Sequence, residues 1–274
     1  MPLTQLIGIA GLSVLVLGFI ISILINRLPS RVDSARFIFA GTVNDADCSI
    51  LLSDGHCVII DTGEETDSEH IVSLLKENGV ETIDYIILTH PDKDHIGGAG
   101  KILDSFQVLS VITPYYGQYS SVYTSLTKKI DELDIERIVL TDTKQYKCGD
   151  LKLTVYPPEE SFYDDDNEYS LVTLVNHGKV NLLFAGDICK TRISEIEDIV
   201  FPEISILKVP YHGRSSNASA DFIRRISPQY AIINAANAES KIEKTLNKLG
   251  CESFCTVGSD WSFTSDGTYV TPEA

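Results

Sequence analysis

The sequence is poor in positive charge and has no internal repeat or low-complexity segment. Its 274 residues include 22 Lys and Arg against 39 Asp and Glu, which gives a formal net charge of −17. A surface that binds DNA or RNA needs a surplus of Lys and Arg to neutralise the phosphates. This charge therefore disfavours a long nucleic acid as partner, unless bound metal ions supply the positive charge.

Cysteines are few, and no two of them form a C-x-x-C pair, so their spacing matches no common metal or redox motif. The even count permits disulfides in an exported domain, whereas in a reducing compartment the same residues would be small buried side chains. We favour the second interpretation. The six residues are Cys48, Cys57, Cys148, Cys189, Cys251 and Cys255.

Charged residues are absent from positions 3–25. About 20 apolar residues span the core of a bilayer, and no Lys or Arg precedes this run as it would in a cleaved signal peptide. We expect a single-pass anchor that contacts the lipid bilayer through residues 3–25. Arg27 and Arg31 follow it, which favours a cytoplasmic location for the rest of the chain. The expected domains are an anchor with its flank (1–31) and a folded domain (32–274).

Within the folded domain, strand and helix patterns alternate in two β-rich halves. The first half has a predicted hairpin at 48–52 and 57–61, followed by an amphipathic helix at 67–78. The second half has strands at 151–156 and 180–185, again with helices interspersed. This order indicates the α/β class, with two sheets face to face and helices outside. The expected architecture is a four-layer αββα sandwich preceded by one transmembrane helix.

The strongest chemical signal is the segment 90–98, which reads HPDKDHIGG and directly follows an apolar strand. In an extended loop, its metal-binding side chains can point in two directions, so one loop can serve two cations. Gly97 and Gly98 allow a tight turn into the next helix. The four metal-binding residues of the segment are His90, Asp92, Asp94 and His95.

Two further predicted strands end in residues that bind metals. The strand at 180–185 is followed by Asp187, and the strand at 204–209 is followed by His212. In sheets of this type, ligands gather at the carboxyl ends of the strands. We therefore expect Asp187 and His212 to join the segment 90–98 in one divalent-cation site.

Together these motifs resemble the metallo-β-lactamase superfamily, most closely the ComEC-like hydrolase domain of DNA-uptake competence proteins. The resemblance covers about residues 36–270 and implies the αββα fold and a metal-dependent hydrolase. The superfamily patterns and the residues that match them are H-x-[HD]-x-D-H-x-G-G (90–98), [IL]-D-T-G (60–63, with Asp61 and Gly63), N-x-x-S-L-V (167–172), G-D (186–187) and [HY]-H-G (211–213).

The resemblance implies a pair of divalent metal ions. The first would be held by His90 and Asp92 and the second by Asp94, His95 and His212, with Asp187 between them. Asp92 stands where many members of the superfamily have His. A site richer in carboxylates shifts the expectation from Zn²⁺ toward Mn²⁺, or toward tolerance of either.

The first cation lacks the third ligand that the family usually supplies as a downstream His. His177 is predicted to lie at a hairpin turn, too far from the site. If that turn centres on His177 and Gly178, either Asn167 or Glu168 lies across from Asp187 and could complete the ligand set or orient the substrate. Residues that could contact a substrate anion, or simply form a turn, are Lys208, Arg214 and Ser215.

The function expected from these observations is a membrane-anchored dinuclear hydrolase. It would act on a phosphodiester through a metal-bridging hydroxide that Asp94 orients. Two alternatives stay open. One is a hydrolase of a small ester, lactone or phospholipid-type head group, and the other is a catalytically idle metal-binding sensor or docking module.

Overall fold

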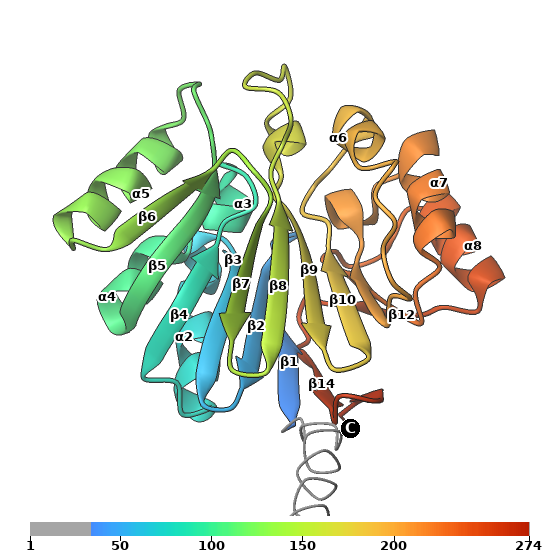
Figure 1. Ribbon diagram of the computed structural model, residues 1–274, viewed down its shortest axis with the longest axis horizontal. Helices are drawn as coiled ribbons and strands as arrows, with labels where there is room; N and C mark the ends of the chain where they lie inside the picture. The colour runs from blue at the N-terminus through green and yellow to red at the C-terminus, as the bar shows by residue number, and fades with distance from the viewer. Residues whose placement is uncertain (1–33, 274) are drawn as a thin grey trace, which may run out of the picture. The chain divides into compact units, whose positions relative to one another are not determined.

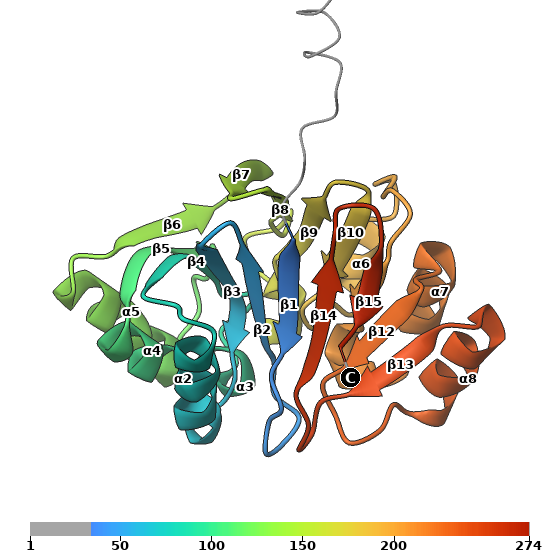
Figure 2. The same cartoon turned by 90° about the horizontal axis from the view of Figure 1, so that it is seen from below.

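The structure is a computed structural model that describes residues 34–273. These residues form two β-sheets that pack face to face, with helices on the outer faces (Figures 1 and 2). The predicted α/β fold with two sheets is confirmed. The predicted membrane segment at 3–25 lies outside the described residues. Within 34–273, no helix has the length and apolar character needed to cross a bilayer.

The first sheet has eight strands in the order β15-β14-β1-β2-β3-β4-β5-β6. Strands β3 to β6 are parallel to one another, and the remaining neighbours are antiparallel. The strands are β1 (Ala35–Phe39), β2 (Cys48–Ser53), β3 (His56–Thr62), β4 (Thr82–Ile87), β5 (Gln107–Pro114), β6 (Glu136–Leu140), β14 (Trp261–Ser265) and β15 (Val270–Pro272).

The second sheet has seven strands in the order β13-β12-β11-β10-β9-β8-β7. Strands β10 to β13 are parallel, and β7 to β10 form an antiparallel meander. The strands are β7 (Lys144–Cys148), β8 (Leu151–Tyr156), β9 (Val172–His177), β10 (Val180–Phe184), β11 (Ile206–Lys208), β12 (Tyr230–Ile233) and β13 (Glu252–Cys255).

Helices cover the outer face of each sheet because their apolar residues recur at helical spacing. Helix α2, for example, buries Ile71, Leu74 and Leu75, whereas α7 buries Phe222 and Ile223. The helices are α2 (Ser68–Glu77), α3 (Lys93–Ile96), α4 (Ala99–Ser105) and α5 (Ser121–Glu132) on the first sheet, and α6 (Lys190–Glu195), α7 (Asn217–Ile226) and α8 (Ser240–Leu249) on the second. Short 3₁₀ segments are η1 (Glu65–Asp67), η2 (Asp166–Tyr169) and η3 (Pro210–Gly213).

Aromatic side chains fill the space between the sheets. Phe39 of the first sheet stacks on Phe184 of the second at 6.2 Å between ring centroids and meets Phe263 edge-on at 5.8 Å. His177 is buried at the end of β9, where its Nδ1 lies 2.8 Å from Ser265 Oγ. The six cysteines are free thiols, and four of them are buried, so within 34–273 no disulfide supports the fold.

Arg192 joins α6 to the ends of β8 and β9. Its side chain is 1% exposed, and its guanidinium donates to the carbonyls of Tyr156 at 2.8 Å and Pro157 at 2.7 Å. It also donates to Ser170 O at 3.3 Å and forms an ion pair with Glu195 at 3.0 Å. This one side chain thus fixes the segment that leads into β9.

We predict that Arg192→Met lowers the free energy of unfolding by about 3–5 kcal/mol, because buried acceptors and a carboxylate lose their donor. Urea denaturation followed by circular dichroism measures this change. The matched control is Arg224→Met on the exposed face of α7, which should change stability by less than about 0.5 kcal/mol. Equal effects of the two substitutions would contradict the role of Arg192.

Candidate metal centre

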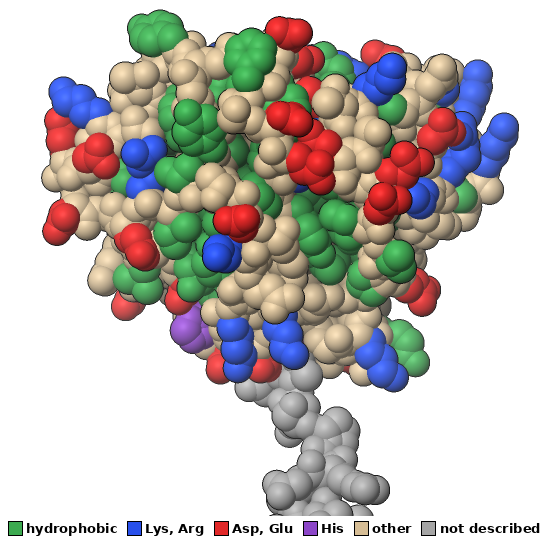
Figure 3. Space-filling model, turned by 45° about the horizontal axis from the view of Figure 1, so that its top comes forward, with side chains coloured by type: hydrophobic (Ala, Val, Ile, Leu, Met, Phe, Trp, Pro, Cys, Tyr) green, Lys and Arg blue, Asp and Glu red, His purple; other side chains and the backbone are tan. Residues whose placement is uncertain are grey.

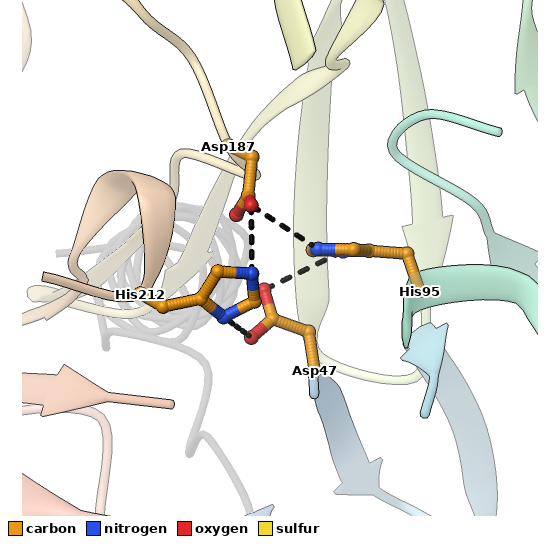
Figure 4. A group of neighbouring side chains, drawn as sticks. All are labelled: Asp47, His95, Asp187 and His212. Atoms are coloured by element: carbon orange, nitrogen blue, oxygen red, sulfur yellow. Dashed lines mark ion pairs between the residues drawn. The ribbon is translucent and has the colours of Figure 1, made fainter. Parts of the chain in front are cut away.

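The segments that follow β4, β10 and β11 meet at one end of the sandwich. They carry His95, Asp187 and His212 to a common point (Figure 4). The Oδ2 atom of Asp187 lies 2.7 Å from His212 Nε2 and 3.4 Å from His95 Nε2. With Asp47, these side chains form a buried group whose ligand atoms all lie within 4.8 Å of one another.

Neighbouring polar groups orient the imidazoles of His95 and His212. His95 Nδ1 lies 2.8 Å from Asp61 Oδ2, and His212 Nδ1 lies 3.1 Å from the carbonyl oxygen of Asn234. A proton on each Nδ1 satisfies these acceptors. A cation that displaces the proton from Nε2 would then bind its lone pair, which is how metal-ligating histidines are usually held. Both Nε2 atoms face Asp187.

His90 stands beside these two residues. Its ring centroid lies 4.0 Å from that of His95, and its Nδ1 is 3.0 Å from Thr89 Oγ1 and 3.3 Å from Ser170 Oγ. Its Nε2 is 3.6 Å from Asp92 Oδ2. His90 and Asp92, the residues that the resemblance implies for the first cation, therefore lie side by side next to His95.

Asp94 lies near the ligands implied for the second cation. Its Oδ2 atom is 3.3 Å from His212 Nε2 and 3.9 Å from His95 Nε2. Burial alone would raise the pKa of Asp94, but the hydrogen bond from His212 and the charge of His95 hold it at about 2. The carboxylate is therefore ionised at neutral pH.

The arrangement fits divalent cations. Among the described residues, the buried Nε2 atoms of His90 and His95 have no hydrogen-bond partner. A buried polar atom without a partner lowers the stability of the fold by about 1–3 kcal/mol. A cation would satisfy both atoms. The donors are imidazole nitrogens and carboxylate oxygens, a set that suits Zn²⁺ and Mn²⁺.

Negative charge dominates the electrostatics of this group. Burial alone would raise the pKa of Asp187, but Lys208, His95 and His212 hold it well below its ordinary value. Burial would lower the pKa of His95, but Asp187, Asp47 and Asp61 raise it to about 10. A field that favours protons on imidazoles also favours metal cations in the same place.

Residues 41–234 match the sequence pattern of the Metallo-beta-lactamase superfamily. The chain belongs to this superfamily. It is 30% identical over 169 residues to "ComE operon protein 3" of Bacillus subtilis, a match that covers 60% of this chain and 21% of that protein. It is 26% identical over 192 residues to "Recombination protein 2" of Haemophilus influenzae, covering 68% of this chain and 22% of that protein. Each match thus spans about a fifth of the relative's length.

The superfamily fold is also clear from solved structures. A diphosphatase described as belonging to the PhnP family superposes with a TM-score of 0.52 at 12% sequence identity. The match covers 84% of this chain and 98% of that one. At this level of identity the likeness shows the fold alone.

Asp47 and Lys208 also belong to the candidate metal centre. Asp47 was not predicted from the sequence. Lys208 is 3% exposed, and its ammonium pairs with Asp47, with Asp187 Oδ1 at 3.0 Å and with Gly186 O at 2.9 Å. An ammonium has three N–H donors, so all three are used. Lys208 is therefore not placed to contact a substrate anion, contrary to the expectation, and it leaves only Oδ2 of Asp187 directed at His95 and His212.

The hairpin of β9 and β10 has a different register from the one expected. His177 pairs with Val180 and Thr173 with Phe184, so the turn is formed by Gly178 and Lys179. Continuing the register brings Ser170, rather than Asn167 or Glu168, across from Asp187. Consistent with this, Ser170 Oγ accepts the backbone N–H of Asp187 at 3.0 Å.

The carboxylate of Glu168 is engaged by the backbone of α6 and does not join the cation ligands. Its two carboxylate oxygens accept the backbone N–H groups of Cys189, Thr191 and Arg192 at 3.1, 2.8 and 2.8 Å. It therefore caps the first turn of α6, as acidic side chains do at helix N-termini. Asn167 lies in η2, and its backbone N–H donates to Asp165 Oδ1 at 3.1 Å.

Arg214 and Ser215 differ in how free they are to meet a substrate. The backbone N–H of Ser215 donates to Glu239 Oε2 at 3.0 Å, and its hydroxyl donates to the same oxygen. Arg214 lies over the ring of Tyr211 at 4.9 Å and pairs with Asp45 Oδ2 at 3.7 Å, with its side chain about half exposed. Of the three residues that could either contact a substrate anion or form a turn, Arg214 is the one whose charged group reaches the surface.

The glycines of the motifs allow the loops to pack closely. The N–H of Gly63 donates to Asp47 O at 2.7 Å, and the N–H of Gly98 donates to Gly63 O at 2.9 Å. A Cβ atom at Gly98 would stand 2.1 Å from Thr62 O, and one at Gly97 would stand 2.4 Å from Lys93 O. Any larger residue at these two positions would displace the loop that carries His95.

We predict a strong coupling between Asp47 and Lys208. Lys208→Met leaves two buried carboxylates without their cation and should lower the free energy of unfolding of the metal-free protein by about 3–5 kcal/mol. In the double variant with Asp47→Asn, one of those charges is gone. The double variant should therefore lose less stability than the sum of the losses in the two single variants, by more than about 1 kcal/mol.

Denaturant titrations of the four proteins in excess chelator measure this coupling. Lys248→Met, at a lysine near the end of α8, is the control for loss of a Lys and should have little effect. Strictly additive losses for Asp47→Asn and Lys208→Met would show that the ion pair does not stabilise the site.

Proposed function

We propose that this protein is a metal-dependent hydrolase of small phosphodiesters. The observation that carries the proposal is the convergence of imidazole Nε2 atoms from His95 and His212 on the carboxylate of Asp187, with Asp94 beside them. Divalent cations held there would lower the pKa of a water molecule and neutralise charge that develops on a phosphoryl group. The expected complement is two ions, Mn²⁺ or Zn²⁺.

In this proposal Asp94 is the catalytic residue. Its side chain is 26% exposed and therefore reaches solvent, whereas that of Asp187 is 2% exposed. Because its pKa of about 2 keeps it ionised, it can accept a hydrogen bond from an attacking water and orient that water. Asp61 and the carbonyl of Asn234 hold the imidazoles, which keeps the reacting geometry fixed.

We infer the substrate class from the charge of the protein surface. Figure 3 shows acidic side chains at the centre of one face, with Lys and Arg mostly toward its edges. The segment before η2 adds Asp164 and Asp165, both exposed. This surface repels long polyanions, whereas a single phosphodiester group could be met by Arg214. A diphosphatase with the same fold supports phosphoryl chemistry on this scaffold.

We predict that the purified protein hydrolyses bis-p-nitrophenyl phosphate when supplied with Mn²⁺ or Zn²⁺ and stops when a chelator removes the ions. Asp94→Asn and His95→Ala should each lower kcat/KM by at least about 100-fold, because the first removes the carboxylate that orients the attacking water and the second removes a ligand of the cation. Metal analysis should give at least two equivalents for the wild type.

His70→Ala is the matched control, since His70 is an exposed histidine that pairs with Asp260 on the surface. It should leave turnover unchanged. Turnover only of carboxylic esters or lactones would replace the phosphodiester assignment with the ester alternative. Bound metal without turnover of either class would favour a sensor or docking module.

We further propose that residues 1–31 anchor the hydrolase domain (32–274) in a membrane, with that domain in the cytoplasm. The support is the uncharged run at 3–25 and the two arginines that follow it. Leu15→Arg together with Leu17→Arg should move the protein from the membrane fraction to the soluble fraction, since each Arg costs about 2.5–3.5 kcal/mol at the centre of a span. Carbonate extraction and ultracentrifugation measure this partition, and a wild-type protein found in the soluble fraction would overturn the proposal.

A further inference from the structure

A second group of metal-binding side chains lies away from the candidate metal centre. It consists of His56, Asp84 and Cys148, whose ligand atoms all lie within 4.8 Å of one another. His56 begins β3, whereas Asp61 of the metal centre lies five residues further along the same strand. At the usual rise per residue this separation is about 17 Å. The two groups therefore occupy opposite ends of β3.

Strands of both sheets supply the three side chains. His56 and Asp84 lie on the neighbouring strands β3 and β4 of the first sheet, while Cys148 ends β7 of the second (Figure 1). Residues that are distant in sequence and belong to separate sheets thus meet at one point. A group that binds all three would tie the two sheets together.

The carboxylate of Asp84 is the centre of this group. Its Oδ1 atom lies 2.9 Å from His56 Nδ1, and its Oδ2 atom accepts the backbone N–H of Cys57 at 3.0 Å. The Sγ atom of Cys148 lies within 4.8 Å of a carboxylate oxygen of Asp84. The Cys57 contact fixes the carboxylate, so its orientation toward His56 and Cys148 does not depend on either of them.

We propose that His56, Asp84 and Cys148 form a second site, one that binds a thiophilic divalent cation of the zinc type. Thiolate, imidazole and carboxylate are the three ligand types that zinc takes in proteins. In a tetrahedral site with bonds of about 2 Å, ligand atoms stand about 3.3 Å apart. The 2.9 Å between His56 Nδ1 and Asp84 Oδ1 needs to open by only a few tenths of an ångström.

Exposure leaves room for a fourth ligand. The side chain of His56 is 47% exposed and that of Asp84 is 18% exposed, so water can reach the fourth position. Cys148 lies on the inner side and is 3% exposed. The cation would therefore sit at the surface, between a buried thiolate and solvent.

Binding releases one proton. The S–H bond of Cys148 breaks, its proton passes to solvent, and the thiolate forms a bond to the cation, while His56 binds through Nδ1 with its proton on Nε2. Burial and the charge of Asp84 raise the pKa of Cys148 to about 12, so the free thiol is protonated at neutral pH. A cation next to the sulfur reverses this preference.

Cobalt substitution tests the proposal on the full chain. Co²⁺ bound by a thiolate gives a sulfur-to-cobalt charge-transfer absorption in the near ultraviolet. The residues of the candidate metal centre are His and Asp alone, so this absorption reports only a cysteine-containing site. We expect it to reach the intensity of one thiolate-bound Co²⁺ per chain, to be absent in Cys148→Ser, and to need at least about tenfold more Co²⁺ in His56→Gln.

Cys189→Ser is the matched control, because Cys189 is the cysteine beside Asp187, with Sγ 3.5 Å from its carbonyl oxygen. It should keep the full absorption. Since His56 is at the surface, His56→Gln keeps the test valid even if Cys148→Ser fails to fold. No charge-transfer absorption in protein that binds Co²⁺ elsewhere, or an absorption that survives Cys148→Ser, would overturn the proposal.

The test is independent of the proposed hydrolase. A charge-transfer absorption without turnover of any phosphodiester would reject the proposed function and keep this site. Turnover with bound metal but without the absorption would reject this site and keep the proposed function.

Discussion

The balance of charge among buried carboxylates is the constraint on which the candidate metal centre depends. Asp47, Asp61 and Asp187 are each at most 4% exposed, and an ionised carboxylate is tolerated at such depth only with a positive partner. Lys208 supplies one positive charge. The remaining negative charge raises the pKa of His95 to about 10. The buried carboxylates need positive charge beside them. Protons on the imidazoles supply it in the metal-free protein, and metal cations would supply it in the loaded protein.

The segment 90–98 could be predicted from the sequence because its function is local. Its metal-binding residues lie close together in the chain, directly after an apolar strand, and position 98 is Gly because a Cβ atom there would stand 2.1 Å from Thr62 O. The carboxyl ends of parallel strands meet at the same edge of a sheet, which is why Asp187 and His212 could be assigned as well. Here pattern and topology lead to the same residues.

Other parts of the site could not be predicted because they depend on tertiary contacts. Asp47 occurs in the loop between β1 and β2, with no motif around it, and only the fold brings it to Lys208. The position of the hairpin turn between β9 and β10 was uncertain by one residue, and a shift of the turn by one residue moves the partner of Asp187 by two residues along the segment before β9. For this reason Ser170, and not Glu168 as expected, lies across from Asp187, and Glu168 instead caps α6.

The backbone at η3 shows how far the tertiary structure overrides local preference at this site. Tyr211 and His212 are consecutive non-glycine residues in the left-handed region, at φ of 52° and 50°, and each such residue costs about 1–3 kcal/mol. The turn directs His212 into the sandwich, where its Nδ1 bonds to Asn234 O and its Nε2 meets Asp187. Because a relaxed turn would direct the imidazole elsewhere, the strain is retained by the same contacts that make His212 a ligand. The position of this ligand is thus set by the packed sheets, and not by the conformational preference of its own segment.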